Sequence, residues 1–167
     1  MTDGGIAVKH TEKFTGAKNG MSMFFVYFGE VAKEVGVERA LALNTRMFEA
    51  MGAAAGQAVR EASGGADLDP VTAGELAGSH IQDTMGFEQE RVEASPELIL
   101  CTCGRCPIYE AAQAVGMDGA TIEAVCRTGS IPYMDAFMRQ LNPRLSYRLT
   151  QFRSSAAEPC REEIVLG

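Results

Sequence analysis

The sequence lacks several features that would place the protein in a membrane or outside the cell. Its longest apolar stretch, Met21 to Phe28, is less than half of the roughly 20 residues that a membrane-spanning helix needs. The polar first residues, MTDGGIAVKHTEKF, contain no apolar run before a small-residue cleavage site, so we expect no secretory signal. We therefore expect a cytoplasmic protein that does not enter the membrane.

An excess of basic residues is also missing. Fifteen lysines and arginines stand against 22 aspartates and glutamates, which gives a net charge of −7 and a pI near 4.9. Nucleic acid is therefore a disfavoured partner, because its phosphates need a basic surface. No phosphate loop, Ser-His-Asp pattern or paired-carboxylate motif is found. A small molecule is the expected ligand or substrate.

The length allows one hydrophobic core. A chain of 167 residues with 46% hydrophobic content can close one core and is short for two. Residues 1–20 carry four glycines among polar residues without a sustained period, which predicts a flexible N-terminal arm. We expect residues 21–167 to form a single domain.

The first half of that domain has a helical pattern. Apolar residues recur at steps of three and four from Met21 to Ala62 with a break near Gly36, which predicts a pair of helices. The small residues of MGAAAGQA would let another backbone approach closely. Asp69-Pro70 is a capping residue followed by proline, so a third helix is predicted from Pro70 to Met85, ending at Gly86.

The second half alternates hairpins and short helices. The segments FEQERVE and ELILCTC flank a turn and predict a β-hairpin whose second strand ends in cysteines. Three short helices are predicted next, starting near Pro107, Asp118 and Ser130. RLSYRLTQFR and REEIVLG predict a second hairpin. The predicted fold class is α+β, with N-terminal helices packed on an antiparallel sheet of two hairpins and short helices inserted between them.

Cysteine is the residue type that points to chemistry. Five cysteines in a chain without an export signal are expected to be thiols, so metal binding or catalysis is favoured over disulfides. Cys106 precedes a helix-opening proline, where unpaired N–H groups and the helix dipole stabilise a thiolate. Cys103 and Cys106 form a C-x-x-C step, and Cys101 adds a C-x-C step.

A metal site would need further ligands. Zinc prefers four, and an iron-sulfur cluster usually takes four cysteines, so Cys126, Cys160 or His80 would have to complete the set. The alternative is that these cysteines are small buried hydrophobes, which is the favoured interpretation for Cys101. His80 lies on the apolar side of its helix, where it is either a packed side chain or a ligand or general base.

The C-terminal segments CPIYEAAQAVGMD, EAVC, LNPRL, YRLTQFR and PCREEIVLG resemble the L-2-amino-thiazoline-4-carboxylic acid hydrolase family over roughly residues 75–166. The cysteines of the family pattern fall on Cys106, Cys126 and Cys160. The sequence is also more distantly similar to the 4-vinyl reductase type of ligand-binding domain. The resemblance implies an α+β domain that hydrolyses a small cyclic C=N compound or binds a small ligand.

The residues and the resemblance therefore predict two alternative functions. In the first, the protein is a hydrolase in which the Cys106 thiolate, or a zinc-bound water, attacks the substrate and His80 moves protons. In the second, it is a non-catalytic module that holds a metal through Cys103, Cys106, Cys126 and Cys160, or that holds an apolar ligand. Zinc is favoured over an iron-sulfur cluster, and the apolar helix from Met21 to Val35 is a candidate homodimer surface.

Overall fold

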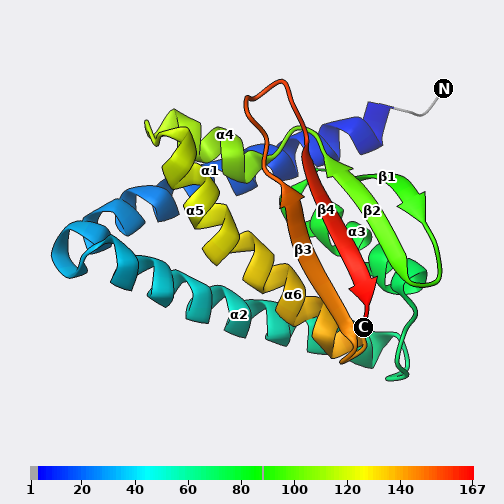
Figure 1. Cartoon of the computed structure of the whole chain (residues 1–167). Helices are drawn as coiled ribbons and strands as arrows, with labels where there is room; N and C mark the ends of the chain where they lie inside the picture. Colours follow the sequence, from blue (N-terminus) through cyan, green and yellow to red (C-terminus); the bar gives the residue numbers. More distant parts are fainter. Residues whose placement is uncertain (1–3, 88) are drawn as a thin grey trace.

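The structure, a computed structural model, describes residues 4–87 and 89–167, with side chains from Thr11 onward. The predicted α+β class is confirmed, as is the order of helices, hairpin, helices and hairpin (Figure 1). The elements are α1 (Gly4–Val35), α2 (Val37–Ala62), α3 (Pro70–Met85), β1 (Gln89–Ala94), β2 (Leu98–Cys103), α4 (Pro107–Ala114), α5 (Gly119–Thr128), α6 (Ser130–Leu141), β3 (Leu145–Gln151) and β4 (Cys160–Leu166).

The described part of residues 1–20, for which a flexible arm was predicted, is the first half of α1 in the structure. This half of the helix packs on elements distant in sequence. Lys13 Nζ lies 2.7 Å from a carboxylate oxygen of Asp83 on α3, and the guanidinium of Arg105 lies 4.5 Å from the ring centroid of Phe14. Tertiary contacts thus stabilise a helix whose glycines and weak periodicity argued against one.

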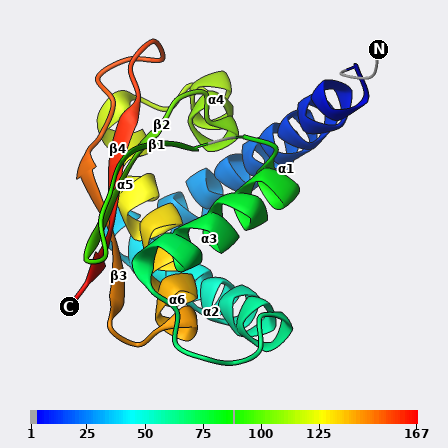
Figure 2. The same ribbon diagram turned by 90° about the vertical axis from the view of Figure 1, so that its right-hand side faces the viewer.

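The four strands found in the described ranges form one antiparallel sheet in the order β1-β2-β4-β3. The last strand is therefore central, and it pairs Cys160 with Cys103 at one end and Ile164 with Ile99 further along. Figure 2 views the sheet nearly edge-on, with α3 and α6 on one side of it. The main core lies in that layer, where Ile99 and Ile164 pack with Phe137 of α6.

Helix α2 covers the outer side of α6 at very short range. Gly52 and Gly56 are both buried. A Cβ atom on Gly52 would lie 2.0 Å from the carbonyl oxygen of Tyr133, and one on Gly56 would lie 2.5 Å from that of Phe137. The predicted close backbone approach at MGAAAGQA is confirmed, because only hydrogen fits at these two positions.

Capping at α3 follows the sequence signals. The Asp69 side chain accepts hydrogen bonds from the backbone N–H groups of Val71 and Thr72, and Gly86 ends the helix with φ at +69°.

The outer face of α1 carries the exposed side chains Met23 and Tyr27, which belong to the surface where a homodimer is predicted. No helix in the described ranges has the length and hydropathy to cross a membrane.

Candidate functional site

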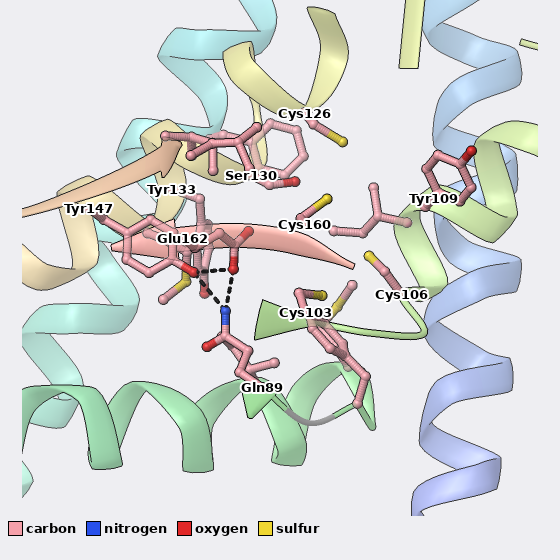
Figure 3. Close-up of a pocket in the computed structure, with 18 of the residues that line it drawn as sticks. Gln89, Cys103, Cys106, Tyr109, Cys126, Ser130, Tyr133, Tyr147, Cys160 and Glu162 are labelled. Carbon is pink, nitrogen blue, oxygen red and sulfur yellow. Dashed lines mark hydrogen bonds between the residues drawn. The ribbon is translucent and has the colours of Figure 1, made fainter. Parts of the chain in front are cut away.

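A cavity of about 380 Å³ lies between the sheet and the helices (Figure 3). All four strands and all of the helices contribute side chains to its wall. Most of the lining is apolar, supplied by methionine, phenylalanine, isoleucine and leucine side chains. Polar groups enter this wall at only a few points, which is the usual composition of a small-molecule site.

Four of the five cysteines line this one cavity. Cys103 comes from the end of β2, Cys106 from the start of α4, Cys126 from α5 and Cys160 from the start of β4. The sequence named these four as one set, and the topology brings them to one wall. Cys101, in contrast, packs against the main core away from the cavity, and burial raises the pKa of its thiol.

Cys106 occupies the N-cap of α4, as the sequence predicted, in an extended conformation just before Pro107. The Cys103 thiol donates a hydrogen bond to the Cys106 sulfur, which lowers the pKa of Cys106. Burial opposes this, but the backbone N–H groups of Tyr109 and Ile108 lower the pKa further. Cys103 carries the opposite shift, its pKa held well above the ordinary value by that hydrogen bond and by burial. Of the two thiols, Cys106 is therefore the one that loses its proton more readily.

A buried arginine, which the sequence gave no reason to select, stands beside these sulfurs. Arg153 is 4% exposed, and its Nε donates to Cys160 Sγ at 3.3 Å. Its Nη2 donates to the carbonyl oxygens of Cys103 at 2.8 Å and Gly104 at 2.6 Å, and its guanidinium lies 4.7 Å from the ring centroid of Tyr109. Within the described ranges no carboxylate lies within 4.0 Å of it. Its charge is balanced by carbonyl dipoles, sulfur and an aromatic face.

A second polar group on the cavity wall is centred on Glu162 of β4 (Figure 3). Its Oε2 accepts hydrogen bonds from Tyr147 Oη at 2.7 Å and from Gln89 Nε2 at 2.5 Å. Gln89 Nε2 also donates to Tyr147 Oη at 2.7 Å. Burial raises the pKa of Glu162. This group was missed in the sequence, although strand alternation in REEIVLG does put the two adjacent glutamates on opposite faces of the sheet.

His80 also lines the cavity, yet it is not hydrogen-bonded to Cys106. Its Nε2 lies 2.8 Å from Tyr133 Oη, and its ring centroid lies 4.9 Å from that of Phe137. Burial lowers the pKa of His80. The ring is thus neutral at pH 7 and held by α6, and its predicted role as a general base stays a prediction.

The four cavity cysteines were also predicted as metal ligands. In the described part of the chain, no three histidine, cysteine, aspartate or glutamate side chains are grouped so that they could hold a metal ion. Arg153 supplies a physical reason, since a permanent cation already bonds Cys160 and lies 3.9 Å from the Cys103 sulfur. The zinc site stays a prediction for metal analysis of the purified protein.

Fold and cavity together define a class: small α+β domains that enclose a thiol-lined, largely apolar pocket between one sheet face and its helices. The family profile described as L-2-amino-thiazoline-4-carboxylic acid hydrolase matches residues 17–161. The chain belongs to this family, and the match includes the helical half, where the resemblance was weaker. The more distant likeness to the 4-vinyl reductase type stays a prediction.

A solved structure shows the same fold with little sequence similarity. It is a trafficking protein particle complex subunit 3 from Naegleria fowleri covalently bound to palmitic acid. The TM-score is 0.58 at 9% identity, and the alignment covers 90% of this chain and 96% of that one. No curated protein matches the chain.

Proposed function

We propose that the protein is a thiol hydrolase that opens a small cyclic C=N compound, with Cys106 as the nucleophile. One observation carries the proposal: Cys106 stands at a helix N-terminus with the Cys103 thiol donating to its sulfur, and it faces a cavity of ligand size. Membership of a family named for such a hydrolase supports the choice of substrate. A thiolate that is both stabilised and accessible to a ligand is the requirement for covalent catalysis.

The reaction has two stages. The Cys106 sulfur adds to the carbon of the C=N bond, the electron pair of that bond moves to nitrogen, and the nitrogen takes a proton. The nitrogen lone pair then re-forms the C=N bond with loss of that proton while a single bond of the ring breaks at the same carbon, and the departing atom is protonated. In the second stage, water adds to that carbon and the nitrogen takes one of its protons. The carbon–sulfur bond then breaks as the oxygen loses its other proton and forms C=O, which releases Cys106 as the thiolate.

Two polar groups of the cavity fit supporting roles in this reaction. The Arg153 guanidinium provides positive charge beside the sulfurs, which stabilises a thiolate and attracts an anionic substrate group. Glu162 retains its proton to a higher pH than an exposed glutamate does because it is buried. It is therefore a candidate donor for the nitrogen. His80 and Tyr133 form a further candidate proton pair on the same wall.

The test uses the purified chain with L-2-amino-thiazoline-4-carboxylate as the probe, and loss of the ring is followed by proton NMR. Cys106→Ser is expected to lower turnover by at least about 100-fold, because a serine hydroxyl here has no adjacent base. Cys101→Ser is the matched control, since Cys101 is another partly buried cysteine but does not line the cavity. Quenching during turnover and measuring the intact mass should reveal the adduct on Cys106.

Two results would overturn the proposal. One is a Cys106→Ser variant that turns over the probe at the wild-type rate. The other is an unmodified Cys106 throughout turnover while activity follows an added metal. Metal content, measured on the same anaerobic preparation, separates a thiolate mechanism from a zinc-bound water.

The apolar lining favours a second function, a binding module that holds a fatty acyl chain without turnover. The cavity wall is mostly carbon, and the structurally similar trafficking protein subunit was solved covalently bound to palmitic acid. Native mass spectrometry with palmitate would show a one-to-one complex in this case. Ile131→Trp, which fills the cavity, should abolish the complex, whereas Val92→Trp on the exposed face of β1 should not. Equal binding by both variants would refute this function.

A further inference from the structure

The relation between Cys103 and Cys106 differs from that between the other cavity sulfurs. Both line the cavity and pack in an apolar cluster that also contains Cys160, the cross-strand partner of Cys103, and a hydrogen bond with the Cys106 sulfur raises the pKa of Cys103. Cys160 instead accepts a hydrogen bond from Arg153. Because the Cys160 sulfur is bonded to Arg153, Cys103 and Cys106 are the cavity pair in which neither Sγ is the acceptor of the Arg153 Nε hydrogen bond, and they are joined by the short C-x-x-C connection.

The backbone around the pair is also fixed. Only Gly104 and Arg105 separate the end of β2 from the N-cap of α4. Arg153 holds the carbonyl oxygens of Cys103 and Gly104, and Arg105 Nε donates to Glu110 of α4 at 2.8 Å. The turn is thus anchored on both sides, which keeps Cys103 and Cys106 together at the junction of β2 and α4.

We propose that Cys103 and Cys106 close a reversible disulfide when a small hydroperoxide enters the cavity, and that this bond switches off the Cys106 nucleophile. The site is a modification site of the same cavity, and what it switches off rests on the proposed hydrolase function. The bond itself does not depend on that function.

The chemistry needs no group beyond the two thiols and the hydroperoxide. The Cys106 sulfur attacks the outer oxygen of ROOH, the O–O bond breaks, and the leaving alkoxide takes a proton to give ROH and Cys106 sulfenic acid. The Cys103 sulfur then attacks the Cys106 sulfur, which forms the S–S bond and releases water. The cysteines lose two electrons and the hydroperoxide gains them. A soluble dithiol reverses the step by thiol–disulfide exchange.

The cavity decides the class of oxidant. Cys103 is 4% exposed and both cysteines line the cavity, so a small oxidant that enters the cavity is favoured over a protein disulfide. A small organic hydroperoxide with an apolar R group fits a wall made mostly of carbon. Hydrogen peroxide is small enough to enter but makes no apolar contacts there. We therefore expect an alkyl or aryl hydroperoxide to be the faster oxidant.

The test exposes the reduced chain to cumene hydroperoxide, alkylates the remaining thiols and maps peptides by mass spectrometry. The wild type should lose two of its five alkylatable thiols, with Cys103 and Cys106 in one linked peptide, and dithiothreitol should restore both. Cys103→Ser should stop at a Cys106 sulfenic acid that dimedone traps. Cys101→Ser, outside the cavity, should form the bond as the wild type does.

Several outcomes would overturn the inference: a bond from Cys106 to Cys126 or Cys160, retention of all five thiols, or equal disulfide formation in Cys103→Ser. The readout is a mass, so it is independent of turnover. If the wild type forms the disulfide but never hydrolyses the thiazoline probe, the proposed hydrolase fails and the redox pair stands. If turnover is normal and no disulfide forms, the redox pair fails and the proposed hydrolase stands.

Discussion

The close packing of α2 on α6 leads to a prediction whose sign differs from the usual behaviour of glycine in helices. Replacing glycine by alanine within an exposed helix normally stabilises it by up to about 1 kcal/mol. At Gly52 the new Cβ would lie 2.0 Å from the Tyr133 carbonyl oxygen. The two helices have to separate by roughly 1 Å to restore van der Waals contact.

The magnitude follows from these opposing contributions. Overpacking of this kind costs about 1 to 3 kcal/mol, and the upper end applies because both sides of the contact are backbone. Subtracting the helix-propensity gain leaves a net loss of about 2 kcal/mol for Gly52→Ala. For a chain of this length, that corresponds to a fall of about 4 to 8 °C in Tm.

Urea unfolding followed by circular dichroism measures the free energy of unfolding. The matched control is Gly29→Ala, because Gly29 lies within α1 and a Cβ there has nothing within 4 Å. The control should be as stable as the wild type or more so. If Gly52→Ala stabilises the protein as Gly29→Ala does, the close packing of α2 on α6 and the reasoning drawn from it are refuted.

Three further predictions concern the cavity. Cys103→Ala removes the donor that lowers the pKa of Cys106, so the pH at half-maximal alkylation of Cys106 should rise; an unchanged profile would contradict the assignment. His80 has a lowered pKa in the folded state, so stability should be full above the unfolded value near 6.5 and should fall as pH drops through that value toward the folded pKa. His80→Gln should remove this part of the slope in urea unfolding, and an identical slope would count against it. Tyr147→Phe removes a donor to Glu162, which should raise the Glu162 pKa in carboxyl carbon-13 NMR and cost about 1 to 3 kcal/mol; no shift would show that the bond is weak.

Helices were predicted well where capping or terminating residues mark their ends in the sequence. Asp69-Pro70 and Gly86 mark both ends of α3, and Gly36 marks the break between α1 and α2. The first half of α1 could not be predicted because its stabilisation is tertiary. Lys13 and Phe14 find their partners on α3 and before α4, and no periodicity within the segment encodes those contacts.

Some residues of the candidate site could also be predicted from the sequence, and others could not. Cys106 at a helix start follows from its proline neighbour, and the family pattern supplied Cys126 and Cys160 as companions. Arg153 and Glu162 could not be selected from the sequence, because each resembles the surface charges around it until the sheet order is known. Glu162 is buried on β4, which pairs between β2 and β3, and Arg153 is buried against the carbonyl groups at the end of β2. Both are non-local contacts.

The central position of β4 also bears on how the protein is made. β2 pairs with β4 and not with β3, so while residues up to about 159 are being synthesised the inner edge of the β1–β2 hairpin has no partner. Cys103 and Cys106 are then present on the nascent chain, but Cys160 and Glu162 are not. The apolar edge at Ile99 stays open to chaperones or to other nascent chains during that interval. A chain that stops before residue 160 would therefore leave this edge of β2 unpaired and Arg153 without its Cys160 partner.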